Sequence, residues 1–249
     1  MRAPAKDARC ENSDHSGCDW YAVTKDDSLQ DSTQTGVPPV DASFSTACRR
    51  CSRLAQFLDA VSERFPAYHA RPVPPFGSLC PRLLVVGLAP GMHGANRTGR
   101  PFTGDHAGIL LYETLHRFGF ASAPVSQSVD DSLRLLDCRI TNAVKCLPPG
   151  NSPAREEIRT CNSYLTGELS ELAPDAAILS LGGIAHSAVL LARKLRLRDF
   201  PFVHGAQYPL PGGNTLFSSY HCSRYNTQTK RLNREMFDAV FARIRAYLQ

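Results

Sequence analysis

Four cysteines have the residue type and the spacing to form a metal site. Two of them make a C-x-x-C motif, a third follows an apolar run, and the fourth lies beyond the next loop: Cys48, Cys51, Cys146 and Cys161. We see no signal peptide, and disulfide frameworks are rare inside cells. Four thiolates suit either tetrahedral zinc or an iron–sulfur cluster. The pattern therefore predicts a metal centre and leaves both metals open, while a C-x-x-C by itself also occurs as a redox motif.

A glycine-rich stretch over residues 87–105 follows the first apolar run and reads GLAPGMHGANRTGRPFTGD. Glycine lets the backbone approach a ligand closely. Exposed backbone N–H groups at a strand-to-helix turn suit a phosphate or an anionic leaving group. A merely tight connecting turn would need far fewer glycines and polar residues. The first binding residues predicted here are Gly87, Ala89, Pro90 and Gly91.

Two more polar motifs follow later apolar runs. Asn142 can present a donor and an acceptor together to the edge of a base, although a buried Asn satisfied by backbone groups is an equal alternative. His221 can donate a hydrogen bond to a developing anion, and the nearby Ser223 and Arg224 suit a backbone phosphate. A single His after a strand is more often structural, so His221 gains weight only together with the other two motifs.

The elements that must position these motifs alternate along the chain. Short apolar runs predict buried strands over residues 82–88, 138–146, 176–181 and 216–220. Amphipathic patterns predict helices over residues 54–65, 107–118, 153–172, 184–195 and 231–247. This alternation predicts an α/β fold, with a central four-stranded parallel sheet between two layers of helices. In such sheets ligands bind beyond the carboxyl ends of the strands, where the polar motifs lie.

Composition and charge limit the function classes further. The chain of 249 residues is 43% hydrophobic and 20% charged, which excludes fibrous, collagen-like and wholly disordered proteins. No run is apolar and long enough to predict a membrane span. Residues 1–45 carry a net charge of −4 and predict a disordered acidic tail, which holds Cys10 and Cys18. Residues 46–249 carry +9 and predict one domain with a polyanionic partner such as nucleic acid, a solvated basic surface being the simpler alternative.

Taken together, the three polar motifs resemble the uracil-DNA glycosylase superfamily. The stretch over residues 87–105, together with NAVKCLPPGN over residues 142–151, resembles its iron–sulfur branch, called family 5 or type B. The resemblance covers residues 47–248 and implies the three-layer fold of that superfamily. The sequence departs from the family's pattern at Cys222, which replaces a proline, and at Ser152, which replaces a lysine.

The resemblance implies a role for each matched residue. The four cysteines would hold a [4Fe–4S] cluster with a structural function, zinc being the second choice. Phe102 would stack under an extruded base, Asn142 would read its Watson–Crick edge, and His221 would donate to the base oxygen as negative charge develops. Many relatives carry a polar, water-activating residue where this chain has an apolar one. We therefore predict that Asp105 orients the water, with Asn151 as the second choice.

The function implied is that of a monofunctional DNA glycosylase in base excision repair. It would hydrolyse the N-glycosidic bond of uracil in DNA and leave an abasic site, acting as a monomer in the bacterial cytoplasm and nucleoid. The apolar Leu88 fits a roomier pocket, which would also admit hypoxanthine or xanthine. Two alternatives are a non-catalytic, metal-containing nucleic-acid-binding module and a hydrolase of free nucleosides or nucleotides.

Overall fold

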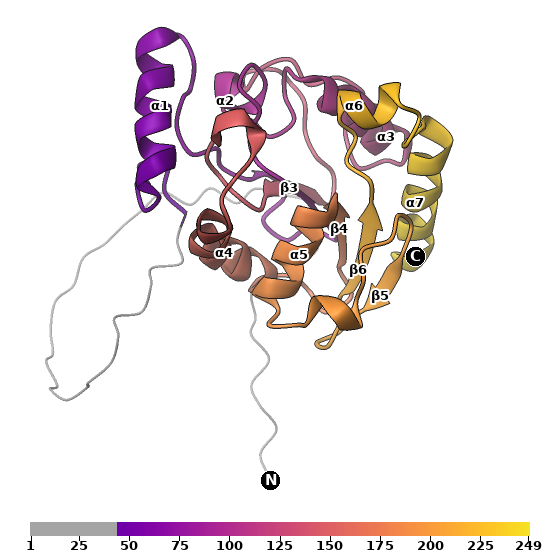
Figure 1. Cartoon of the computed structure of the whole chain (residues 1–249). Helices are drawn as coiled ribbons and strands as arrows, with labels where there is room; N and C mark the ends of the chain where they lie inside the picture. The colour runs from indigo at the N-terminus through magenta and orange to yellow at the C-terminus, as the bar shows by residue number, and fades with distance from the viewer. Residues whose placement is uncertain (1–43) are drawn as a thin grey trace, which may run out of the picture. The chain divides into compact units, whose positions relative to one another are not determined.

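The computed structural model describes residues 44–249 (Figure 1). Nearly all of the predicted acidic tail, with Cys10 and Cys18, lies outside the described residues. Within the described part of the chain, none of the helices is both long enough and apolar enough to cross a membrane.

A six-stranded sheet forms the centre of the described domain. Its four inner strands are parallel, in the order β3 (Cys138–Asn142), β2 (Leu83–Gly87), β4 (Ala177–Leu181) and β6 (Thr215–Ser219). These are the four predicted strands, and the expected parallel centre is confirmed. Two short antiparallel strands, β1 (Phe76–Gly77) beside β3 and β5 (Gln207–Pro209) beside β6, complete the edges. They escaped prediction because so few residues carry no readable periodicity.

Helices cover both faces of the sheet, because the inner strands are apolar on both sides. The covering helices are α3 (His106–Arg117), α4 (Arg155–Ser170), α5 (Gly183–Ala192) and α7 (Arg234–Tyr247). Leu83 and Val85 of β2 share one apolar cluster with α3 and α7, whereas Leu84 and Val86 share another with α4 and α5. This division follows from the alternation of side chains along a strand. The predicted three-layer α/β/α arrangement is confirmed (Figure 1).

A third apolar cluster attaches α1 (Ser52–Arg64) to the domain. Leu54, Leu58 and Val61 recur with helical spacing on one face of α1 and are buried against the chain that follows β3 and against α4. The remaining helical segments are short: α2 (Ala95–Thr98), η1 (Pro149–Asn151), η2 (Leu197–Asp199) and α6 (Arg224–Gln228).

Strand β3 ends earlier than the strand predicted over residues 138–146. Beyond Asn142 the Ala143 and Val144 N–H groups still donate to the carbonyls of Gly87 and Leu88, at 2.9 and 3.0 Å. The backbone N–H of Lys145 instead donates to the Cys161 Sγ, at 3.3 Å. Residues 143–147 stay buried between α1 and α4. Their composition therefore gives no sign of where the strand ends. This segment leads directly from the carboxyl edge of the sheet to the cysteines.

Candidate active site and candidate metal centre

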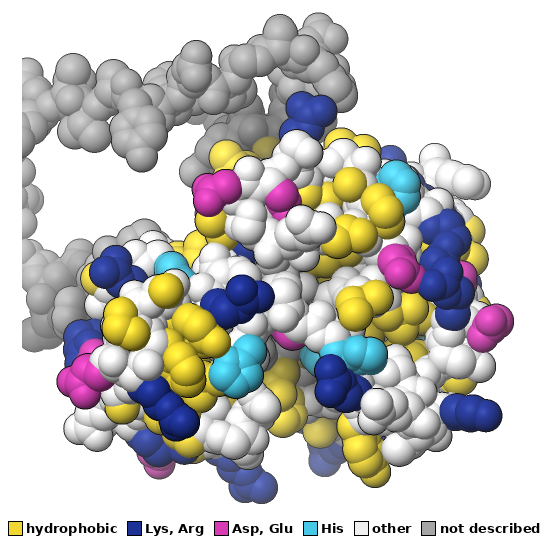
Figure 2. Space-filling model, turned by 90° about the horizontal axis from the view of Figure 1, so that it is seen from above, with side chains coloured by type: hydrophobic (Ala, Val, Ile, Leu, Met, Phe, Trp, Pro, Cys, Tyr) yellow, Lys and Arg dark blue, Asp and Glu magenta, His cyan; other side chains and the backbone are white. Residues whose placement is uncertain are grey.

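A pocket of about 370 Å³ opens where the parallel strands end. This volume lies within the range typical of small-molecule and cofactor sites. All three polar motifs contribute to its walls: Ala89, Gly91, Phe102 and Asp105 from the first, Asn142 and Asn151 from the second, and His221 and Ser223 from the third. Figure 2 looks onto this end of the molecule, which bears Lys, Arg and His side chains. The structure thus brings together most of the residues that the sequence singled out.

Three predicted binding residues do not line this pocket. Gly87 lies beneath it at the end of β2, and Pro90 is buried in the turn that follows. Arg224 is exposed and lines an adjoining pocket that shares Phe102 and Asp105 with the first one. Two small wall residues, Ala95 and Ala107, were missed, since an alanine in a sequence carries no chemical signal.

Asn142 is held at the edge of the pocket by the pairing of the two central strands. It lies opposite Gly87 in the register between β2 and β3 and is 3% exposed. A Cβ added to Gly87 would lie 2.4 Å from the Asn142 Oδ1 and 2.7 Å from the ring of Phe102, so only glycine fits there. The Oδ1 is buried without a hydrogen-bond partner among the described residues. Because such an atom is costly unless something binds it, a ligand donor is the natural partner.

Phe102 presents its ring to the pocket from a strained backbone. Its φ angle is +56°, a conformation that a bulky side chain rarely adopts. Its ring lies 5.8 Å from that of His221 between centroids, at an interplanar angle of 27°. Backbone strain of this kind concentrates at binding sites. The arrangement leaves an aromatic face on which a planar ligand can stack.

His221 follows β6 and enters the pocket as a neutral imidazole. Burial lowers its pKa to about 4, and its Nδ1 has no hydrogen-bond partner within residues 44–249. The Asn226 Nδ2 donates to the His221 carbonyl at 2.8 Å, and the Ser223 side chain caps α6. Cys222, in place of the family's proline, is fully buried in the core. The loop that carries His221 is therefore held in place by the buried Cys222 side chain and by the hydrogen bond from Asn226.

Asp105 occupies the N-cap of α3. Its Oδ1 accepts a hydrogen bond from the Gly108 N–H at 3.0 Å, while a Cβ added to Gly94 would lie 2.6 Å from its Oδ2. Burial raises the pKa of this carboxyl group despite the hydrogen bonds from the first turn of α3. Asn151 lines the opposite part of the pocket from an exposed turn with a φ of +55°. Both side chains are placed where they can hold a water molecule.

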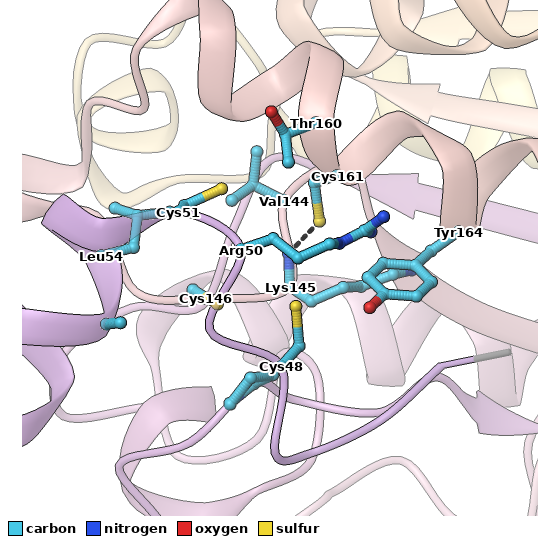
Figure 3. A pocket seen from close by; sticks show the side chains of 12 residues that line it. Cys48, Arg50, Cys51, Leu54, Val144, Lys145, Cys146, Thr160, Cys161 and Tyr164 are labelled. Carbon is cyan, nitrogen blue, oxygen red and sulfur yellow. Dashed lines mark hydrogen bonds between the residues drawn. The ribbon is translucent and has the colours of Figure 1, made fainter. Parts of the chain in front are cut away.

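The four predicted cysteine ligands surround a second cavity (Figure 3). Cys48 and Cys51 come from the segment before α1, Cys146 from the segment after β3, and Cys161 from α4. All four are free thiols rather than disulfides. Arg50, Lys145 and Tyr164 line the same cavity. Within residues 44–249, no three His, Cys, Asp or Glu side chains are arranged to hold a single metal ion.

The electrostatics of this cavity fit a bound cationic group. Burial, together with repulsion from the other three thiols, raises the pKa of Cys146 to about 12. Burial and repulsion from neighbouring thiols also raise the pKa of Cys51. At Cys48 the effect of burial is outweighed by hydrogen bonds with Tyr164 and Arg50, which lower the pKa of that thiol. Thiolates crowded in this way are stabilised by metal coordination. The donor set suits zinc or an iron–sulfur cluster by its chemistry.

Comparison with known proteins gives consistent relatives. Residues 74–245 match the family described as the uracil DNA glycosylase superfamily. Three proteins named type-5 uracil-DNA glycosylase align over most of their length. The one from Thermus thermophilus is 51% identical over 197 residues, covering 77% of this chain and 90% of the relative. Those from Mycobacterium leprae and Pyrobaculum aerophilum are 43% and 41% identical, covering 82% and 80% of this chain and 93% and 88% of the relatives.

Proposed function

Because the chain belongs to the uracil-DNA glycosylase superfamily, and within it to the type-5 enzymes, we propose that it excises uracil from DNA. It hydrolyses the N-glycosidic bond and leaves an abasic site, as a step of DNA repair. The observation that carries the proposal is the pair of buried, unpartnered polar atoms, Asn142 Oδ1 and His221 Nδ1, beside the ring of Phe102. An enzyme that flips a base out of the stack needs just such a combination of stacking face and edge-reading groups.

Three side chains contact the base, each at a different place. Phe102 offers its ring to the extruded base, and Asn142 accepts a hydrogen bond from a ring N–H on the Watson–Crick edge. His221 donates its N–H to a base oxygen on which negative charge grows as the C–N bond breaks. A preorganised donor in a site shielded from water stabilises such charge strongly. Since burial keeps the imidazole neutral, it donates a proton in a hydrogen bond without transferring it.

Asp105 is the proposed water-orienting residue. Its Oδ1 is occupied by the N-cap hydrogen bond, which leaves Oδ2 available on the pocket side. Leu88 lines the same pocket, but its apolar side chain cannot hydrogen-bond to a water molecule and orient it. Asn151 is the second choice, because its amide is exposed at the pocket rim.

The test of this function is cleavage of a labelled duplex with one central uracil, followed by alkali. We expect a strand break at the uracil position and none in the matched normal-base duplex. Matched duplexes with hypoxanthine or xanthine test the wider substrate range that Leu88 favours. Binding to uracil DNA without a break after alkali would contradict the enzyme assignment and favour a non-catalytic binding module. Cleavage of free deoxyuridine alone would instead favour a nucleoside hydrolase.

The pH dependence should separate the roles of His221 and Asp105. Since the pKa of His221 is about 4, the single-turnover rate should be constant between about pH 6 and pH 8, where an ordinary histidine titrates. The rate should fall on the acid side as Asp105 takes up a proton, because only the carboxylate can accept one from water. Burial raises the pKa of Asp105, which moves this fall to a higher pH than that of an ordinary aspartate.

The control for this profile is Asp105→Asn. An Asn side chain keeps the N-cap acceptor of α3 but cannot act as a base, so most of the rate should be lost. Any acid limb that persists near pH 4 then belongs to His221. A histidine-like titration between pH 6 and pH 8 in the unmodified protein would contradict a neutral His221.

The four cysteines are proposed to hold a [4Fe–4S] cluster. Four cysteine thiols line one cavity, a donor set that suits a cluster and also zinc, which is the second choice. When bound, the cluster would tie together the segment before α1, the segment after β3 and α4. Lys145 contributes its backbone N–H to the Cys161 sulfur at 3.3 Å.

We further infer that the protein acts on DNA as a monomer in the bacterial cytoplasm and nucleoid. The net charge of +9 on residues 46–249 supports attraction to the phosphate backbone. Affinity for a uracil-containing duplex should accordingly fall as the salt concentration rises.

A further inference from the structure

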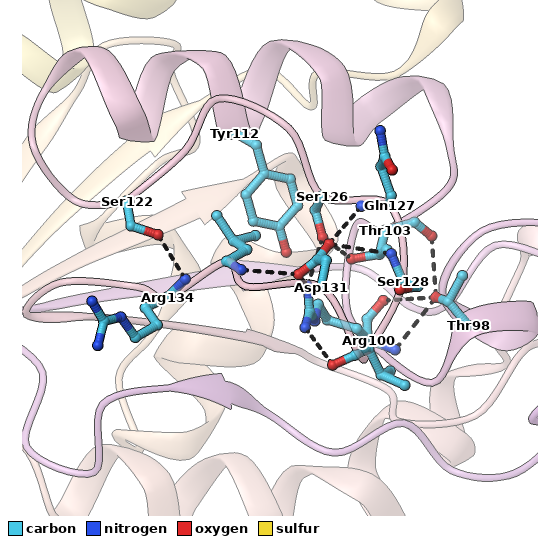
Figure 4. Close-up of polar contacts among 12 residues, drawn as sticks. Thr98, Arg100, Thr103, Tyr112, Ser122, Ser126, Gln127, Ser128, Asp131 and Arg134 are labelled. Carbon is cyan, nitrogen blue, oxygen red and sulfur yellow. Dashed lines mark hydrogen bonds and ion pairs between the residues drawn. The ribbon is translucent and has the colours of Figure 1, made fainter.

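Residues 122–134 form a loop that packs against the segment carrying Arg100 and Thr103 (Figure 4). The antiparallel pairing of Ala121 with Leu135 closes this loop at its base. Residues 124–126 of the loop line the adjoining pocket that contains Arg224 and shares Phe102 and Asp105 with the proposed base pocket. The loop thus borders the proposed active site beside Phe102.

Arg100 joins the loop to the active-site segment. It is 5% exposed, and its guanidinium donates to the Asp131 Oδ1 at 2.6 Å and to the Ser126 Oγ at 3.1 Å. The guanidinium also donates to the Val129 carbonyl at 2.8 Å and lies 4.3 Å from the ring centroid of Phe76. A charge buried this deeply persists only when it is paired and hydrogen-bonded. The loop supplies the carboxylate, hydroxyl and carbonyl partners of this charge.

Asp131 in turn fixes the shape of the loop. Its carboxylate accepts hydrogen bonds from the backbone N–H groups of Gln127, Ser128 and Leu133 at 2.8, 3.2 and 3.1 Å. Burial favours the neutral acid, but the hydrogen bonds from Arg100 and these amides outweigh burial and lower the pKa of Asp131. One ionised carboxylate therefore organises the loop and binds the arginine at the same time.

Arg100 and the loop hold the segment around Phe102, whose backbone is strained. Phe102 has a φ of +56° and is flanked by residues that are tied down on both sides. The Thr103 Oγ1 lies 2.6 Å from the Ser126 Oγ of the loop, and the Tyr112 hydroxyl donates to the Pro101 carbonyl at 2.8 Å. A strained conformation of this kind lasts only where its surroundings over-determine it.

We propose that the Arg100–Asp131 ion pair is a positioning device for base stacking. Through the loop over residues 122–134 it holds the backbone of Phe102, and hence the ring, in the orientation that receives the extruded base. The inference rests on the proposed excision of uracil. Asp131 and Arg100 are positioning residues, since both act through Phe102 rather than on the substrate.

The experiment is a double-mutant cycle between Asp131→Ala and Phe102→Ala, read by the single-turnover rate of uracil excision. Fluorescence of 2-aminopurine placed beside the uracil reports extrusion of the base. Asp130→Ala is the matched control, because Asp130 is the exposed neighbour and its loss changes the net charge equally. Thermal unfolding of each variant shows whether the domain is intact. Asp131→Asn, which keeps an oxygen for Arg100, enters the cycle if the alanine variant does not fold.

Asp131→Ala should lower the excision rate by about 10- to 100-fold, the size expected when a positioned group shifts by roughly 1 Å. It should also lower the extrusion signal. In the Phe102→Ala background the same substitution should cost less than about threefold, because the residue through which it acts is gone. Equal losses in both backgrounds, or a loss no greater than that of Asp130→Ala, would overturn the proposal.

The cycle also separates this proposal from the function on which it rests. If the unmodified protein leaves uracil DNA intact, the proposed function fails and the inference fails with it. If the unmodified protein cleaves and the cycle is additive, only the positioning role fails.

Discussion

Replacing His221 with alanine is expected to slow single-turnover excision of uracil by about 100- to 1000-fold, the usual loss when one preorganised donor to a developing oxyanion is removed. The imidazole is buried, neutral and stacked beside Phe102, and its Nδ1 lacks a partner among residues 44–249. Its removal takes nothing from the core except a stacking contact. The effect should therefore appear in the chemical step rather than in DNA affinity, which a binding titration at the same salt concentration checks.

Two further variants make this result specific. His221→Gln keeps a hydrogen-bond donor in the pocket and should recover part of the rate. His116→Gln changes a histidine of α3 outside the pocket while keeping a hydrogen-bond donor for the Ala121 carbonyl, and should leave the rate unchanged. A wild-type rate in His221→Ala, or an equal loss in His116→Gln, would contradict the assigned role.

Replacing Cys146 with serine is expected to abolish the metal centre and to destabilise the domain. Cys146 is the proposed ligand from the segment after β3, so its loss would remove the metal link of that segment to α1 and α4 and leave only the apolar packing. Metal-binding free energy counts as folding free energy, and a loss of several kcal/mol lowers the melting temperature of a domain of this size by roughly 10 °C. The measurements are the visible absorbance of the purified protein, its iron, sulfide and zinc content, and its melting temperature.

Cys80→Ser is the matched control, since Cys80 is exposed and lies outside the cavity. It should keep colour, metal content and melting temperature. One zinc per chain and no iron in the unmodified protein would reject the cluster in favour of zinc. Neither metal in a folded, active protein would contradict a metal centre altogether.

The framework of this fold was predictable because its signals are local. Each inner strand is a short apolar run, and each large helix has an apolar face, so their positions agree with the structure to within a few residues. The end of β3 was not predictable, since Val144, Cys146 and Leu147 are apolar for a different reason, namely burial beside the cysteine cavity. The two edge strands are too short to carry a pattern.

The site was predictable in its members but not in its geometry. Polar motifs at strand ends predicted that Phe102, Asn142 and His221 would meet, and one pocket contains all three. The ion pair between Arg100 and Asp131 could not be predicted, because a sequence does not show which charged residues of separate loops will meet. The need for glycine at position 87 likewise arises from a neighbour on another strand. The roles assigned to the individual residues remain predictions.

The segment over residues 142–146 bears on how the protein matures. Asn142 and Cys146 stand at its two ends, so the proposed base-reading group and a proposed ligand of the metal centre share one stretch of backbone. A newly made chain that has not acquired its proposed cluster has no covalent tie at one end of that stretch. Pairing of β3 with β2 still places Asn142 in such a chain, but the backbone beyond it lacks that tie. Incomplete assembly should therefore yield a less stable domain.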